Sequence, residues 1–217
     1  MGITSYTRRR RAENRPANAV SRATFIRVTS NSQIEVVEAM AKEIWKEHYT
    51  PIIGGEQVDY MLERFQSKKA ISVQIREGVV YFLIGAGTKF IGYMAVQPKG
   101  PALFLSKIYV GSSKRTMGYG SQAVIFIEDL ARRRGLGLIY LTVNKNNTAS
   151  LRFYEKLGFR NLGSVVQDIG GGFVMDDYKM GKYVSMFGGA GERTRVGMKR
   201  DRVGPFGIMQ GGKVRSR

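Results

Sequence analysis

The sequence contains no cysteine and only one histidine, His48, among its 217 residues. The lack of cysteine excludes disulfides, thiolate zinc sites and a cysteine nucleophile, and it is typical of a reducing compartment, so a cytoplasmic location is expected. A single histidine excludes a multi-histidine metal centre, and no metal site is expected. No apolar run approaches the roughly 20 residues that a membrane-spanning helix needs, so no membrane contact is expected.

The formal net charge is +18, and the two ends of the chain carry more than half of it. Residues 1–23 have a net charge of +5, and residues 184–217 have a net charge of +6. Neither segment shows hydrophobic periodicity, and the second is rich in Gly and Arg, so both are expected to be disordered basic tails. Arg-rich arms can contact phosphates without folding, which leaves weak nucleic-acid contact as one interpretation and sequence without a role as the plainer one. One folded domain is expected over residues 24–183.

The hydrophobic pattern of that domain predicts an α/β fold with a mixed sheet. Apolar alternation or short apolar runs predict strands at residues 24–29, 70–76, 79–85, 89–97, 103–110, 138–143, 159–168 and 173–182. Apolar residues at helical spacing predict helices at about residues 33–47, 56–66, 118–134 and 147–157. The first helix is expected to start at a Ser30 or Asn31 cap and to be broken by Pro51 and the following Gly54-Gly55 pair.

The stretch KRTMGYG at residues 114–120 connects a predicted strand to a predicted helix. Its Arg115, Gly118 and Gly120 fit the spacing R-x-x-G-x-G. Glycines allow consecutive backbone N–H groups to point at one spot, the helix start adds a positive dipole end, and the arginine adds a charge. The pattern predicts a phosphate-binding turn, with an ordinary strand-to-helix loop as the alternative. It lacks the Lys-Ser/Thr ending of a P-loop and the dinucleotide fingerprint.

The run LSKIYVGSSKRTMGYGSQAVIFIEDLA, followed by IYLTVNKNNTASLRFYEKLGF, resembles the GNAT acetyltransferase superfamily. The resemblance covers about residues 24–183. The stretches EIWKEHYTPIIGGEQVDYML and VVQDIGGGFVMDDYKM are similar to the PaiA-type diamine, or spermidine/spermine, N-acetyltransferases. The resemblance implies a mostly antiparallel central sheet flanked by helices, acetyl-CoA as co-substrate, and a small primary amine as acceptor, with a polyamine such as spermidine or spermine as the first expectation. Members of the superfamily often dimerise, so a homodimer is a further expectation.

The resemblance also implies contacts with acetyl-CoA at the positions that match the family's motifs. Backbone groups of Ile108, Tyr109 and Val110 would hold the pantetheine arm. The pyrophosphate turn is implied at Arg115, Thr116, Met117, Gly118, Tyr119 and Gly120. Thr116 is a departure, because many members have glycine there. The motif N-x-x-A-x-x-x-Y falls on Asn147 and Tyr154, with Ser150 where the motif has alanine.

Acetyl transfer to an amine requires a neutral nitrogen, a donor for the developing oxyanion and a proton for the departing sulfur. A backbone N–H near Val110 is expected to stabilise the oxyanion, and the phenol of Tyr154 is the expected general acid. A packed aromatic is the alternative for Tyr154, since Leu151 and Leu157 flank it at helical spacing. A bridging water or one of five side chains would serve as general base: Glu43, Glu47, His48, Asp176 and Asp177. The carboxylates considered for a cationic acceptor pocket are Glu43, Glu47, Glu56 and Asp59.

Other functions stay open at this point. The acceptor could be another small amine or a protein amine, which this sequence does not distinguish from a polyamine. The basic tails favour a nucleic-acid-associated protein, although the core carries no helix-turn-helix or RNA-recognition signature. A cofactor-binding fold without catalysis is a third class, and the presence of Tyr154 argues mildly against it.

Overall fold

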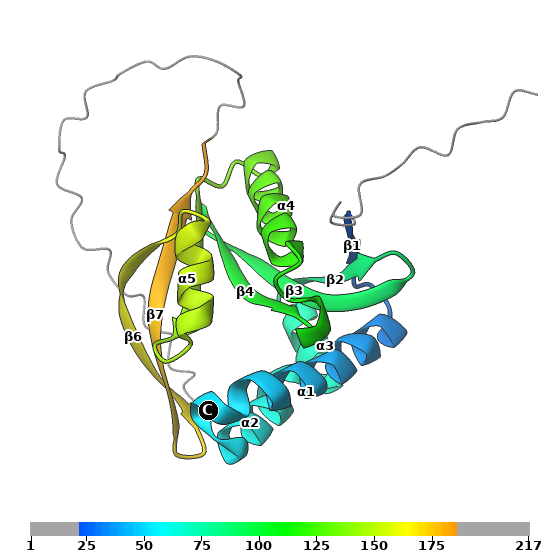
Figure 1. The fold of residues 1–217 in the computed structure, drawn as a ribbon, viewed down its shortest axis with the longest axis vertical. Helices are drawn as coiled ribbons and strands as arrows, with labels where there is room; N and C mark the ends of the chain where they lie inside the picture. The colour runs from blue at the N-terminus through cyan, green and yellow to red at the C-terminus, as the bar shows by residue number, and fades with distance from the viewer. Residues whose placement is uncertain (1–21, 186–217) are drawn as a thin grey trace, which may run out of the picture. The chain divides into compact units, whose positions relative to one another are not determined.

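The computed structural model describes residues 22–185, so the predicted tails lie outside it except for two residues at each end. The described chain forms a seven-stranded sheet in the order β1-β2-β3-β4-β5-β7-β6 (Figure 1). The strands are β1 (Ala23–Arg27), β2 (Val80–Ala86), β3 (Lys89–Lys99), β4 (Ala102–Val110), β5 (Leu138–Asn144), β6 (Arg160–Gly170) and β7 (Phe173–Tyr183). The helices are α1 (Asn31–Ile53), α2 (Gly55–Met61), α3 (Lys68–Arg76), α4 (Tyr119–Arg133) and α5 (Thr148–Lys156), with a π-helical turn at Leu62–Gln66 and a 3-10 turn at Ser112–Lys114. The predicted α/β fold with a mostly antiparallel sheet is confirmed.

The sheet opens between β4 and β5, its one pair of parallel neighbours in the described chain. Their pairing covers Ala102 to Phe104 on β4, opposite Leu138 to Tyr140 on β5. Beyond it, β4 continues along β3 as far as Val110, while β5 continues along β7 as far as Asn144. The two strands therefore diverge and leave a V-shaped gap in the sheet (Figure 1).

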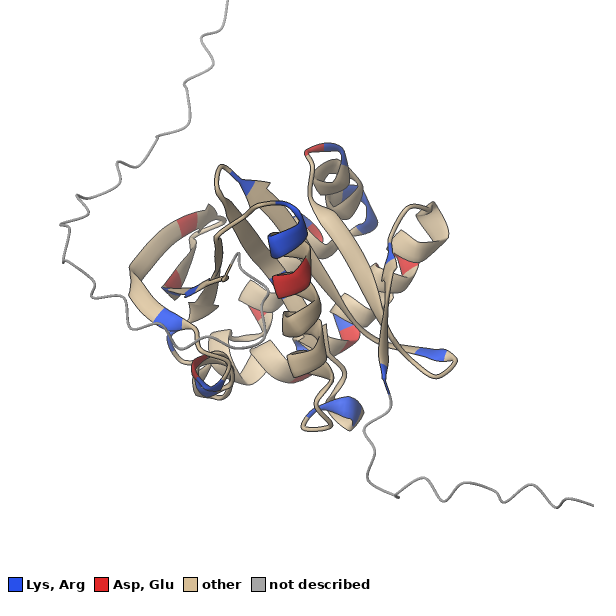
Figure 2. Ribbon diagram, turned by 90° about the horizontal axis from the view of Figure 1, so that it is seen from above, with Lys and Arg blue, Asp and Glu red and all other residues tan. Residues whose placement is uncertain are grey.

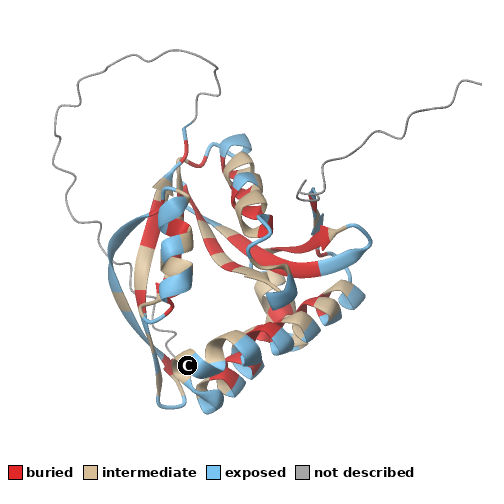
Figure 3. Ribbon diagram, viewed as in Figure 1, coloured by how far each residue is buried: buried red, intermediate tan, exposed pale blue. Residues whose placement is uncertain are grey.

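Two hydrophobic clusters cover the two faces of the sheet. Along β2, Phe82 and Ile84 pack on the face covered by α4 and α5, whereas Tyr81 and Leu83 pack on the face covered by α1, α2 and α3. This alternation is the period-two pattern of a strand buried on both faces. Figure 3 shows the buried positions on the central strands and the inner sides of the helices, with β6 exposed at the sheet edge. No helix within residues 22–185 is long and apolar enough to cross a membrane.

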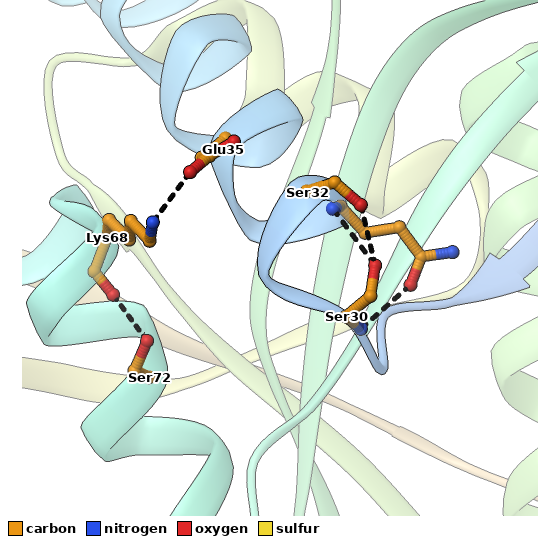
Figure 4. A network of polar contacts seen from close by, with 6 residues as sticks. Ser30, Ser32, Glu35, Lys68 and Ser72 are labelled. Atoms are coloured by element: carbon orange, nitrogen blue, oxygen red, sulfur yellow. Dashed lines mark hydrogen bonds and ion pairs between the residues drawn. The ribbon is translucent and has the colours of Figure 1, made fainter.

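The long helix α1 begins as predicted but does not break at Pro51. Ser30 accepts a hydrogen bond from the Gln33 N–H, and the Gln33 side chain returns to the Ser30 N–H, which forms a capping box (Figure 4). Pro51 lies in the last turn of the helix, where losing one backbone donor removes a single hydrogen bond close to the end. The helix therefore runs to Ile53 and ends at Gly54, whose φ of 84° suits glycine.

The segment predicted as a strand at 70–76 is instead the helix α3, so the predicted hairpin with residues 79–85 is wrong. Ser67 caps this helix by accepting a hydrogen bond from the Ala70 N–H. Ile71 and Ile75 are four residues apart, so both face the cluster beneath α1, with Ile71 fully buried. Lys68 pairs with Glu35 of α1 and attaches the two helices at the surface (Figure 4). The apolar positions of these seven residues fit both periods, and packing beneath α1 together with the Ser67 cap decides for the helix.

Candidate active site

A cavity of about 430 Å³ lies where β4 and β5 diverge. Its walls come from the second half of β4, the turn before α4, the start of α4, the end of β5, α5, and the last turns of α1. The lining includes Ile108, Tyr109, Val110, Arg115, Thr116, Gly118, Tyr119, Gly120 and Tyr154 from the predicted set. The other two predicted residues do not line the cavity: Met117 is exposed to solvent, and Asn147 is buried in the protein interior. The structure thus gathers nine of the eleven predicted residues around one space.

The β4 wall carries a bulge and then an open edge. Ala95 of β3 pairs with Lys107 and Val96 pairs with Leu105, so Ser106 is an extra residue that bends β4. Because pairing with β5 ends at Phe104, the following backbone on that edge borders the cavity. Backbone groups in this position can bond an extended chain that carries amides, as strands do when they accept an added strand.

The turn after β4 has the conformation that a phosphate site needs. Thr116 has a φ of 62° and Gly118 a φ of 79°, so both lie in the left-handed region. Gly118 precedes α4 and offers no side chain to cap it, which leaves the first N–H groups of α4 to other partners. A methyl group at Gly120 would lie 3.0 Å from the ring of Phe153, so the close approach of α5 also favours glycine there. Thr116, which has a side chain, is strained in this left-handed conformation.

Arg115 lies between this turn and α1. Its Nε donates to the Val110 carbonyl oxygen at 3.0 Å, and its guanidinium lies 3.5 Å from the carboxylate of Glu47. The arginine predicted for phosphate contact thus also joins β4 to the end of α1. Glu47, considered both as a base and as an acceptor carboxylate, is occupied by this ion pair.

Asn147 connects α5 to α1 and is only 2% exposed. Its Oδ1 accepts a hydrogen bond from the Ser150 N–H at 3.2 Å, which caps α5. Its Nδ2 lies 3.2 Å from Nε2 of His48. Because the oxygen faces the helix, the amide nitrogen must be the donor, and Nε2 of His48 is the acceptor. A role of Asn147 toward the cofactor remains a prediction.

His48 borders the cavity as a neutral imidazole. Burial is the main cause that lowers its pKa below 6.5, and the nearby Arg115 charge lowers it further. The charge of Glu47 acts in the opposite direction. Since Nε2 accepts from Asn147, the ring proton is on Nδ1 in the neutral form. Of the five candidate bases, His48 is the one in the cavity wall.

Three tyrosines from three elements line the cavity together with His48: Tyr49 of α1, Tyr109 of β4 and Tyr154 of α5. Burial raises the pKa of all three phenols. The charge of an ionised Tyr49 would raise the pKa of Tyr154 further, which places the two hydroxyls near each other. Tyr154 also packs against Phe153 and Phe159, so the packing role considered for it is real and coexists with its place in the cavity wall.

The other predicted carboxylates lie elsewhere. Glu43 and Asp59 border a separate groove on the outer side of α1 and α2, and Asp59 pairs with Lys46 at 3.3 Å. Glu56 is exposed at the start of α2. The expected ring of carboxylates around a cationic acceptor is therefore not assembled from these residues. On β7, exposed Asp176 pairs with Lys145 at 2.5 Å, whereas Asp177 is buried; nothing in the sequence pattern separated these two neighbours.

Comparisons with known proteins agree with this arrangement. The profile of the acetyltransferase (GNAT) family matches residues 38–159, more than half of the chain. YhdJ, an uncharacterized N-acetyltransferase of Bacillus subtilis, is 26% identical over 132 residues, which cover 58% of this chain and 92% of that protein. A spermidine N(1)-acetyltransferase of Thermoplasma acidophilum is 22% identical over 157 residues, which cover 70% of this chain and 94% of that protein. The crystal structure of a PaiA N-acetyltransferase from Thermoplasma acidophilum in complex with coenzyme A matches with a TM-score of 0.61 and 20% identity, covering 74% of this chain and 98% of that one.

Proposed function

The chain belongs to the GNAT family and is an N-acetyltransferase that uses acetyl-CoA. We propose that its acceptor is a polyamine such as spermidine or spermine. The cavity between β4 and β5 supports acetyl transfer to an amine, because it brings a phosphate-type turn, a neutral imidazole and a phenol to one space. The similarity to a spermidine N(1)-acetyltransferase supports the polyamine among amine acceptors.

The cavity suits acetyl-CoA in shape and in the groups that it offers. The backbone of Ile108, Tyr109 and Val110 would hold the pantetheine arm along the open edge of β4. The turn from Arg115 to Gly120 would hold the pyrophosphate, because its left-handed residues and the start of α4 direct N–H groups outward. Acetyl-CoA supplies an activated acetyl group as a thioester.

Tyr154, in the cavity wall, is the proposed general acid. Burial raises its pKa, which keeps the phenol protonated at working pH and able to donate toward the departing sulfur. His48 is the proposed general base, because its lowered pKa keeps it neutral. The proton of the acceptor amine, directly or through water, would go to Nε2, which must release its hydrogen bond from Asn147 to accept it. A backbone N–H near Val110 is the proposed donor to the acetyl carbonyl oxygen.

The acceptor side favours a slender molecule over a folded protein surface. The α2 helix is attached to the β6–β7 hairpin, and the two lie side by side at the open end of the V (Figure 1). The Tyr60 hydroxyl donates to the Ile169 carbonyl at 2.7 Å, and Gln57 donates to the Val174 carbonyl at 3.1 Å. Tyr60 also lies against Gly170 and Gly171, where any Cβ would come within 3.0 Å of its ring or hydroxyl. These contacts support a slender alkyl polyamine over a protein acceptor to the extent that the acceptor approaches past α2 and the hairpin.

The test is thiol release from acetyl-CoA by the purified full chain with a panel of acceptors. Spermidine, spermine, a monoamine and a peptide with a free N-terminus represent the competing classes. Turnover that is fastest with the polyamines supports the proposal. Turnover that is fastest with the peptide or the monoamine rejects the polyamine and keeps the acetyltransferase.

Nucleic-acid contact by the basic tails is a separate proposal, and both tails lie outside the described residues. Within the described chain, Lys and Arg positions are spread over helices, strands and turns, with acidic positions among them (Figure 2). The charge of the ends, +5 and +6, therefore carries this proposal. Binding to a nucleic acid should weaken steeply as salt rises and should disappear when residues 1–23 and 184–217 are deleted, while acetylation persists.

A further inference from the structure

Asp177 of β7 carries a buried carboxylate that the fold itself does not neutralise. The residue is 4% exposed, and its Oδ1 has no hydrogen-bond partner among residues 22–185. A hydrogen bond from Thr142 satisfies part of the group, and Lys145, the nearby cation, is already paired with Asp176. Burial is the main cause that raises the pKa of Asp177 above its usual 3.8. A buried carboxylate in this state destabilises a protein, and such groups gather at functional sites.

The carboxylate lies directly behind the acceptor end of the cavity, which we define by His48, Tyr49 and Thr142. Asp177 pairs with Asn144 across the β5–β7 ladder and shares a sheet face with Thr142, whose side chain hydrogen bonds to it. Tyr49 lies close enough for the charge of Asp177 to raise the pKa of its phenol. Both Thr142 and Tyr49 line the cavity, so one layer of hydroxyl-bearing side chains separates Asp177 from it.

The charged side chains that line the cavity itself are basic: Lys107, Lys114 and Arg115. The phosphates of acetyl-CoA would balance the charges at the turn, but they offer a cationic acceptor no anion at its own end. Glu47 does not supply this anion freely, because it is paired with Arg115. The negative charge near the acceptor end that is left without a full partner is Asp177.

We propose that Asp177 determines specificity for acceptors that carry a second amine, by attracting the positive charge that this amine keeps. The inference rests on the proposed amine acetylation. An attacking amine must lose its proton, so a monoamine has no charge left in its reactive form. A diamine or polyamine reacts at one neutral nitrogen while another stays an ammonium ion. Because Oδ1 is enclosed, the attraction acts across the hydroxyls of Thr142 and Tyr49, where burial weakens solvent screening.

The test compares 1,4-diaminobutane with butylamine, which differ only in the second amine. Asp177→Asn keeps the shape and an oxygen for Thr142 but removes the charge. Asp176→Asn is the matched control, since it removes the adjacent exposed carboxylate that already has a lysine partner. We expect Asp177→Asn to lower the diamine-to-monoamine ratio of kcat/KM on the order of 30-fold, mainly through the KM for the diamine. We expect Asp176→Asn to leave the ratio within about 3-fold of the wild type, since exposed pairs contribute little. An unchanged ratio in Asp177→Asn overturns the proposal.

A binding measurement separates this proposal from failure of the proposed reaction. With coenzyme A present, 1,4-diaminobutane should raise the thermal midpoint of the wild type and of Asp176→Asn but not that of Asp177→Asn. Asp177→Asn should itself unfold at a higher temperature than the wild type at neutral pH, which shows that it folds. If the wild type acetylates no amine but this pattern holds, the ammonium site stands and the reaction is wrong. If the diamine raises the midpoint of Asp177→Asn as much as that of the wild type, the ammonium site is wrong.

Discussion

Asn147 holds the site together, and its replacement by alanine should cost a predictable amount of stability. The change removes the cap of α5 through the Ser150 N–H and the hydrogen bond to Nε2 of His48. Loss of an N-cap costs about 1 kcal/mol, and loss of a hydrogen bond at a buried position costs about 1 to 2 kcal/mol more. The free energy of unfolding should therefore fall by about 2 to 3 kcal/mol, and the thermal midpoint by about 5 to 10 °C for a domain of this size.

A second variant divides this loss into its two parts. Asn147→Ser keeps a capping oxygen but has no amide to reach His48, so it should lose only about 1 to 2 kcal/mol. Exposed Asn146→Ala is the control and should stay within about 0.5 kcal/mol of the wild type. Urea unfolding followed by circular dichroism measures all three. The reasoning is refuted if Asn147→Ala matches the wild type, or if Asn147→Ser loses as much as Asn147→Ala.

Three further predictions concern pH and backbone strain. The pKa of His48 is lowered below 6.5, so as pH falls through 6.5 the unfolded chain binds a proton that the folded protein does not, and stability should fall. In His48→Gln this dependence of stability on pH should be flatter, as measured by thermal unfolding between pH 5 and 8. Burial lowers the pKa of Lys107 from 10.5 to about 8, so below pH 8 the folded protein holds a buried charge. Lys107→Met should therefore be more stable than the wild type at pH 7 by about 1 to 3 kcal/mol, and the difference should shrink as pH rises from 8 to 10.5; a constant difference contradicts this. Thr116→Gly should relieve the left-handed strain and raise the thermal midpoint. Thr116→Val, which is still β-branched, should not raise it. Equal midpoints for the two variants argue against strain.

Local signals in the sequence were sufficient for most of the fold. The short apolar run of β5 and the Gly-rich turn before α4 were each sufficient to place an element, and both elements are confirmed. The segment at 70–76 alternates as a strand does, yet it is a helix because Ser67 caps it and Ile71 packs beneath α1. Alternation over a short segment does not separate the two periods, so packing against the rest of the chain decided.

The candidate site could be predicted only where a motif carried it. The turn from Arg115 to Gly120 and the position of Tyr154 follow from the motif, and both meet at the cavity. The pairing of His48 with Asn147 joins residues 99 positions apart, so no local pattern contains it. Asp177 differs from Asp176 only in the face of β7 that it occupies, and the strand register that decides this is set by the partner strand.

The central claim is that this cavity acetylates an amine with Tyr154 as the proton donor. The most direct measurement is thiol release from acetyl-CoA with spermidine by the wild type and Tyr154→Phe, with acetyl-CoA affinity measured by calorimetry for both. The account predicts turnover by the wild type and a decrease of about 100-fold or more in kcat for Tyr154→Phe, with affinity for acetyl-CoA retained. Equal turnover by the two proteins, or no turnover by a wild type that binds acetyl-CoA, would contradict it.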